Sequence, residues 1–204
     1  MPCRQSTYTL AVLGNTLQTA LLGMFAYWGP KAVTFMFHLP KGNADLIFGA
    51  VTVLAGIVGT LGGGLLLDAI GGSARAAAGV CLLSCSIGFM LLEASFHFCH
   101  SIAPFVAVFA TGEVALFMLQ SPITRIILVS VPPELRPMAF GIQTVAIHVL
   151  GDVPSPPLAG WIHDHVFDPD DIVRRTWLLC LHACAAASTK KHAFASMPFA
   201  GRVL

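Results

Sequence analysis

Five stretches of this sequence are apolar over lengths that can cross a lipid bilayer. A helix needs about 20 mostly apolar residues to span the hydrocarbon core. Hydrophobic residues make up 56% of the chain and charged residues only 10%, whereas soluble domains carry about 25% charged residues. The sequence therefore predicts an all-α membrane protein with five to six transmembrane helices. The predicted spans are residues 7–28, 45–68, 76–96, 102–129 and 138–161.

A sixth apolar stretch, residues 176–188, is shorter and is followed by Lys190 and Lys191. That length suits an interfacial or incomplete segment, and the two lysines make a longer span costly. The connections between the spans are short and polar, at residues 29–44, 69–75 and 131–137. They leave no room for a separate soluble domain.

The basic residues give a weak prediction of orientation. With an even number of spans, seven Lys or Arg residues fall on the side of both termini and four fall on the other side. Because cytoplasmic loops are enriched in Lys and Arg, both termini are expected in the cytoplasm. The net charge of +1 argues against a nucleic-acid partner. Residues 1–9 lack the features of a secretory signal.

Cysteine and histidine patterns do not predict a metal or a cofactor. Four of the six cysteines form i, i+4 pairs inside apolar runs, where small buried hydrophobic side chains are more common than zinc ligands. A disulfide framework is equally unexpected in so apolar a chain. The triplet of His163, Asp164 and His165 fits a solvated loop better than a metal site.

The fifth apolar stretch contains an unusual combination of residues. Pro154, Pro156 and Pro157 follow closely on His148 and Asp152, with Ser155 among them. Prolines prevent a continuous helix, and freed backbone groups at membrane depth need protein or water around them. His148 and Asp152 share a helix face because they are four residues apart. Broken helices with polar groups near the midplane are typical of transporters, although this pair can also bond internally and simply hold the kink.

Other polar side chains lie inside the predicted spans. Glu113 is a carboxyl group that should face a partner or water, and Pro122 should kink the fourth span. If water reaches His148, that side chain can also respond to pH near neutrality. The candidate residues for lining a substrate cavity are Asn15, Gln18, Glu113, Gln120, His148 and Asp152.

The second span carries small residues on one face. Ala55, Gly59 and Gly63 recur every four residues, which allows two helix backbones to approach closely. This stripe serves either static packing or a sliding contact. Asp68 ends the span, where it either pairs with a neighbouring helix end or is solvated.

Membrane-embedded catalysis is not supported by the pattern. The residues before Asp152 lack the first glycine of the Gly-x-Gly-Asp motif of membrane aspartyl proteases, and hydrolase constellations of Ser and His do not occur at suitable spacing. We therefore expect a protein that is not an enzyme.

Several uncommon sequence motifs occur together, in the same order as in a known protein family. The segments at residues 27–32, 43–68, 112–122, 135–160 and 164–165 resemble the spinster-like branch of the major facilitator superfamily, above all through HVLGDVPSP at 148–156. The similarity extends from about residue 10 to about residue 180. It implies a transporter of sphingolipids or lysolipids, in which twelve spans form two six-helix halves.

The resemblance implies that this chain corresponds to the C-terminal half of such a bundle. Residues 1–188 would form a half transmembrane domain, and residues 189–204 a divergent cytoplasmic tail. The family's proton-coupling residues lie mainly in the other half, so none is transferred here. Two positions depart from the family pattern: Ala69 stands where a basic residue usually follows Asp68, and Arg125 stands where relatives carry uncharged residues.

The predicted function is transport of an amphipathic lipid by alternating access, with this chain as part of a carrier. An isolated half would need a homodimer partner or a first-half polypeptide to cover its polar inner face. Two alternatives are a non-transporting or inactive half-bundle that acts as an interaction partner, and a carrier of another small solute. The resemblance implies a multi-pass location in late endosomal, lysosomal or plasma membranes.

Overall fold

The computed structural model describes residues 2–166, and this part of the chain is built from helices without a strand. The all-α fold predicted from the composition is therefore confirmed. A short 3₁₀ helix, η1 (Pro133–Leu135), precedes the sixth α-helix, and a π-helix, η2 (Ile147–Asp152), follows it. The α-helices are α1 (Pro2–Phe37), α2 (Lys41–Ala69), α3 (Ala74–Phe98), α4 (Ile102–Phe117), α5 (Gln120–Ser130), α6 (Arg136–Ala146) and α7 (Ser155–Val166).

Four of the predicted spans appear as helical segments with the length and apolar character needed to cross a membrane. They cover residues 6–37, 41–69, 74–98 and 102–130. The fifth predicted span, residues 138–161, is instead divided among α6, η2 and α7, each shorter than a full crossing. The predicted segment 176–188 and the tail 189–204 lie outside the described residues.

The first helix is longer than the sequence predicted. Residues 29–44 were expected to form a connection, but α1 continues through Pro30 to Phe37 and the connection shrinks to residues 38–40. Pro30 cannot donate a backbone hydrogen bond to the preceding turn. The apolar side chains beyond it compensate, because Val33 is fully buried and Phe37 packs against the same apolar cluster. Tertiary burial therefore overrides the proline.

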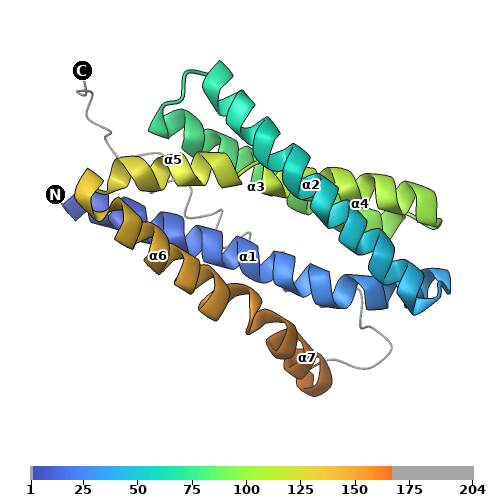
Figure 1. The fold of residues 1–204 in the computed structure, drawn as a ribbon. Coiled ribbons are helices and arrows are strands. Elements are labelled where there is room, and N and C mark those ends of the chain that lie inside the picture. Colours follow the sequence, from blue (N-terminus) through green and yellow to red (C-terminus); the bar gives the residue numbers. More distant parts are fainter. Residues whose placement is uncertain (1, 167–204) are drawn as a thin grey trace.

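Figure 1 shows how the helices are arranged around α1. On one side of α1 lie α2, α3 and the α4–α5 segment, which pack closely on one another. On the other side, α6, η2 and α7 form a bent rod that packs mainly against α1. The rod consequently has a broad outward face that no described element covers.

The interior contains two apolar clusters. The first is rich in aromatic rings, which include Phe25, Phe48, Phe96, Phe105 and Phe109. Ring centroids of Phe48 and Phe109 lie 4.8 Å apart, and those of Phe96 and Phe105 lie 5.0 Å apart. The second cluster consists of smaller aliphatic residues: Ala11, Leu67, Ala77, Ala78, Leu119, Ile123, Ile126 and Ile127.

A layer of polar side chains separates these two clusters along the helices. On α1, Asn15 and Gln18 lie between Ala11 of the aliphatic cluster and Leu21 of the aromatic cluster. Both amides are only 2% exposed, and Glu113 of α4 is 3% exposed. We call Asn15, Gln18, Thr52, Glu113 and Gln120 the polar layer.

Candidate functional site

Glu113 is the acidic member of the polar layer. Its partner is Thr52 on α2, whose hydroxyl lies 3.1 Å from each of the two carboxyl oxygens. One hydroxyl proton can be donated to only one acceptor at a time. Among the described residues, Thr52 is the one side-chain donor to this carboxyl group, which makes the contact sensitive to any change at position 52.

The amides of the polar layer join α1 to the α4–α5 segment. The Gln18 Nε2 atom donates to the backbone oxygen of Leu116 at 3.0 Å, and Gln120 Nε2 lies 3.5 Å from Gln18 Oε1. Leu116 is in the last turn of α4, where carbonyl groups lack helical partners. Gln18 thus satisfies a helix end from a neighbouring helix. Asn15 Oδ1 is buried without a hydrogen-bond partner among the described residues.

The fourth span breaks just before Pro122. The prediction placed a kink at this proline, and the structure places the interruption at residues 118–119, about one turn upstream. This offset follows because a proline removes the hydrogen bond to the carbonyl four residues earlier, which here belongs to Met118. The Met118 carbonyl faces α2 at Gly63, where a Cβ atom would overlap it.

The small-residue stripe of α2 is placed against this break. Ala55, Gly59 and Gly63 are all buried. A Cβ atom at Gly59 would lie 2.5 Å from the Val114 carbonyl oxygen. Ser121 also donates its hydroxyl to the Thr60 carbonyl at 2.9 Å. The stripe therefore permits close contact between the α2 backbone and the α4–α5 junction.

The predicted break in the fifth stretch begins before the prolines. The chain widens into the π-helix η2, in which the Val153 amide donates to the His148 carbonyl at 3.2 Å. Ser155 is the first residue of α7, so Pro156 and Pro157 occupy its first turn. Prolines are tolerated there because first-turn amides have no helical partners. Single π-helical turns inside α-helices are frequent at functional sites.

His148 and Asp152 form the pair that their spacing predicted. The distance from His148 Nδ1 to Asp152 Oδ2 is 2.9 Å, and the histidine side chain is 55% exposed. The other carboxyl oxygen, Asp152 Oδ1, is shielded but has no hydrogen-bond partner among the described residues. Ser155 donates its hydroxyl to the Asp152 carbonyl at 3.2 Å. The pair therefore has one acceptor atom still to satisfy.

Glycines hold η2 directly against α1. A Cβ atom at Gly151 would lie 2.9 Å from the Thr16 carbonyl oxygen, and one at Gly23 would lie 2.8 Å from the Cα of Asp152. Further along, Trp28 Nε1 donates to the Pro156 carbonyl at 3.1 Å. The broken helix is thus held against α1 before the prolines and at Pro156 itself.

Arg125, one of the two departures from the family pattern, contacts the turn that follows α2. After Asp68 and Ala69, the chain turns through Gly71 and Gly72, which both have positive φ angles. Arg125 of α5 donates from Nε to the Gly72 carbonyl at 3.3 Å. A basic side chain near a helix C-terminus is favourable electrostatically. Arg125 therefore supplies a cation to the α2 end although position 69 lacks one.

The structure separates the sequence-predicted candidates into two groups. Asn15, Gln18, Glu113 and Gln120 belong to the polar layer, three of them are fully buried, and hydrogen bonds join Gln18, Glu113 and Gln120 to neighbouring helices. These buried residues consequently do not form the polar inner face that was expected to need a partner to cover it. His148 and Asp152 are the candidates on the rod, where the His148 side chain is exposed and Asp152 lies against Gly23 of α1.

Sequence reasoning missed other polar contacts of the bundle. The sequence around Thr52 gives no sign of its role, because that role depends on contact with Glu113, which lies 61 residues later in the sequence. Glu93 and His97 of α3 form a contact of 3.0 Å with the same i, i+4 spacing as His148 and Asp152. That spacing could have identified them.

Comparison with known proteins agrees with this architecture. The model of the Organic Anion Transporter Polypeptide family matches residues 2–100 and 93–166. The chain belongs to the Organic Anion Transporter Polypeptide family. The individual proteins that are similar to this chain carry spinster names. The chain is 44% identical over 159 residues to the Arabidopsis thaliana protein "Probable sphingolipid transporter spinster homolog 2". The aligned region covers 78% of this chain and 32% of the relative.

Other relatives give the same result. "Probable sphingolipid transporter spinster homolog 3" of Arabidopsis thaliana is 42% identical over 167 residues, or 80% of this chain and 31% of the relative. The human "Protein spinster homolog 1" is 29% identical over 189 residues, or 85% of this chain and 34% of the relative. The chain spans about a third of the length of these relatives. The predicted resemblance to spinster proteins is confirmed, and the protein is a multi-pass membrane protein.

Proposed function

We propose that this chain is part of a carrier that moves an amphipathic lipid of the sphingolipid type across a membrane by alternating access. The observation that carries the proposal is the broken rod, in which an ionisable His–Asp pair lies within the π-helix η2 of a membrane bundle. Intramembrane ionisable residues are costly and generally mark a functional pathway. The names of the Arabidopsis thaliana relatives supply the substrate class.

The chain would work within a larger assembly. Its relatives are about three times longer than the matched region, and the outward face of the rod has no cover among residues 2–166. A second copy of the chain or a first-half polypeptide would complete the substrate pathway. Chemical crosslinking in native membranes is expected to yield one of these two complexes, and mass spectrometry of the product distinguishes them.

Transport is tested directly with reconstituted protein. The chain, alone and with any partner found by crosslinking, is placed in liposomes with a labelled long-chain sphingoid lipid. Flux above that of protein-free liposomes is expected. Absence of flux by all correctly inserted forms would favour a half-bundle without transport activity.

Glu113→Gln is expected to reduce this flux about tenfold. The amide keeps the size of the side chain and an oxygen that can accept from Thr52, but it removes the acidic group. A tenfold change in rate corresponds to about 1.4 kcal/mol. The matched control is Glu134→Gln, because Glu134 lies in η1 at an exposed position. Initial rates measured at equal protein density decide the comparison. Equal rates for both variants and the unmodified chain would remove Glu113 from the mechanism.

A further inference from the structure

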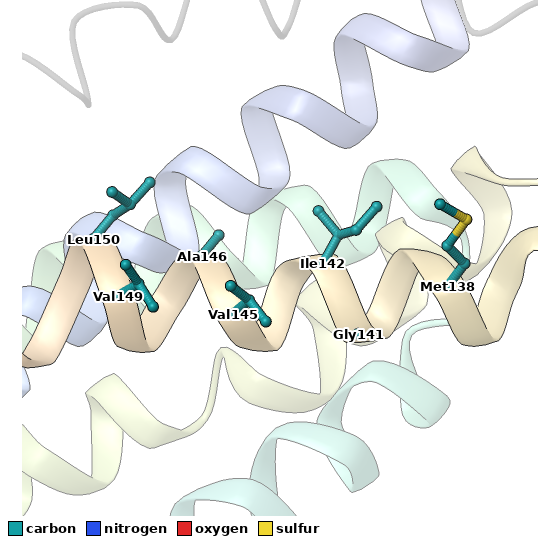
Figure 2. A pocket seen from close by; sticks show the side chains of 7 residues that line it. All are labelled: Met138, Gly141, Ile142, Val145, Ala146, Val149 and Leu150. Atoms are coloured by element: carbon teal, nitrogen blue, oxygen red, sulfur yellow. The ribbon is translucent and has the colours of Figure 1, made fainter.

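The turn between η2 and α7 divides the rod into two parts. Figure 2 shows α6 and η2 as one continuous helical segment that carries the side chains from Met138 to Leu150. Figure 1 shows the bend that lies between this segment and α7. The two residues between η2 and α7 are Val153 and Pro154. We call these two residues the joint.

The prolines remove backbone hydrogen bonds across the joint. Three of the four residues 154–157 are prolines, which have no amide hydrogen to donate to the carbonyl group four residues earlier. The carbonyl groups of Leu150, Asp152 and Val153 therefore lose the partner that a regular helix would give them. The Ser155 hydroxyl replaces one of these partners, because it donates to the Asp152 carbonyl at 3.2 Å. Sharp bends in helices concentrate at prolines and at π-helical turns, so a change of angle at the joint breaks few bonds.

The part of the rod before the joint is seated on α1. A Cβ atom at Gly151 would lie 2.9 Å from the Thr16 carbonyl oxygen, so the two backbones are in direct contact. At the other end of this part, the Tyr8 hydroxyl donates to the Ala139 carbonyl at 2.8 Å. Ala139 and Gln143 of α6 are both buried. These contacts hold α6 and η2 in place along α1.

The part after the joint, α7, is attached to α1 around Trp28. The indole Nε1 of Trp28 donates to the Pro156 carbonyl at 3.1 Å. A Cβ atom at Gly160 would lie 3.2 Å from the same indole ring. Ala159 is 8% exposed and belongs to the aromatic cluster. α7 therefore covers one side of the aromatic cluster, and Trp28 is the side chain that holds it there.

The Trp28 indole is itself held by a cation. The Lys31 ammonium lies 4.4 Å from the centroid of the Trp28 ring and 3.8 Å from that of the Tyr27 ring. The two rings meet edge to face, with their centroids 5.3 Å apart. An ammonium group over an aromatic face is attracted by the negative potential of the ring. Lys31 and Tyr27 thus fix the indole in the position from which it reaches α7.

We propose that α7 is a lid that swings about the joint, while α6 and η2 stay on α1, and that Trp28 is the latch that holds it closed over the aromatic cluster. Lys31 is the positioning residue of this latch. The 12 residues of α7 extend about 18 Å from the joint. A change of about 20° at the joint, a usual size for a helix kink, would move the far end of α7 by about 6 Å.

An open lid would give an apolar solute a lateral path from the lipid to the aromatic cluster. As a gate for that solute, the lid rests on the proposed function. Its motion, however, is measured without any substrate, so the two can fail separately.

Trp28→Phe tests the latch, because phenylalanine keeps an aromatic ring but cannot donate to Pro156. Spin labels on cysteines introduced at Leu46 of α2 and Leu158 of α7, which are 73% and 55% exposed, report the position of the lid. The full chain is placed in nanodiscs with its six native cysteines replaced by serine, and pulsed electron paramagnetic resonance measures the distance. The ratio of long to short distances is expected to rise about tenfold, in line with the loss of one hydrogen bond.

A second label pair reports the part of the rod that should stay in place. It joins Leu65 of α2 to Val145 of α6, and both side chains are exposed. Trp28→Phe is expected to leave this distance unchanged. Pro154→Ala restores an amide donor at the joint and is expected to reverse about two thirds of the change caused by Trp28→Phe.

Lys31→Met tests the positioning residue with the latch itself intact. Methionine keeps the apolar stem but removes the cation, so the ratio of open to closed lid is expected to rise about threefold. Lys41→Met is the matched control, because Lys41 is an exposed lysine at the start of α2. This surface substitution also keeps the test available if Trp28→Phe does not fold.

Two results would overturn the lid. Equal shifts of both label pairs would show that the rod moves as one body, and unchanged distances in both Trp28→Phe and Lys31→Met would show that α7 is fixed. A lid that moves in a chain without flux would refute the proposed transport only. Flux with an immobile α7 would refute the lid only.

Discussion

The substitution Gly63→Ala is expected to lower the stability of the folded bundle by about 3 kcal/mol, the upper end for overpacked cores. The Cβ atom would overlap the Met118 carbonyl, and that carbonyl belongs to backbone rather than to a flexible side chain. Helices α2 and α4 must therefore separate. Unfolding of the purified chain in mild detergent, followed by circular dichroism against denaturant, measures the change.

The control for this experiment lies one residue earlier. Gly62 has no atom within 4 Å of its ideal Cβ position, so Gly62→Ala removes a helix-destabilising glycine at no steric cost. A change of up to about 1 kcal/mol in the stabilising direction is expected. If both alanine variants shifted stability equally, the close contact between α2 and the α4–α5 junction would be wrong.

Thr52→Val is expected to destabilise the bundle by about 2 kcal/mol. Valine keeps the shape of threonine but removes the hydroxyl that contacts both carboxyl oxygens of Glu113. A buried polar group left without its partner costs about 1–3 kcal/mol, and more when it is charged. The same unfolding measurement applies, and the double variant Thr52→Val with Glu113→Leu should recover part of the loss.

Thr111→Val provides the comparison for this second prediction. Thr111 is exposed on the same helix as Glu113, and its hydroxyl donates only to the Ala107 carbonyl of its own helix at 2.8 Å. We expect a change of less than about 0.5 kcal/mol, as is usual for surface substitutions. A comparable loss in both variants would show that the Thr52–Glu113 contact does not contribute specifically.

The sequence predicted those features of the fold that depend on local chemistry. Apolar length identified four spans, since a bilayer requires about 20 such residues whatever the tertiary structure is. Pro122 predicted the break in the fourth span, and Pro154, Pro156 and Pro157 predicted the break in the fifth. The spacing of His148 and Asp152 predicted their contact, which is observed at 2.9 Å.

Other features depended on partners distant in sequence and could not be predicted. The continuation of α1 past Pro30 follows from the burial of Val33 in an aromatic cluster contributed by other helices. The burial of Asn15, Gln18 and Glu113 likewise requires knowing which helix faces meet. Their part in substrate binding stays a prediction, whereas the pairing of Glu113 with Thr52 became visible only in three dimensions.

The polar layer has a mechanical consequence. Sliding α1 by one helical turn, about 5.4 Å, would carry Gln18 away from the Leu116 carbonyl and from Gln120. The Gln18 amide would then lose its hydrogen-bond partners, which is costly where water cannot replace them. The layer therefore opposes axial sliding between α1 and the α4–α5 segment, and Thr52–Glu113 adds α2 to the helices that it holds in register.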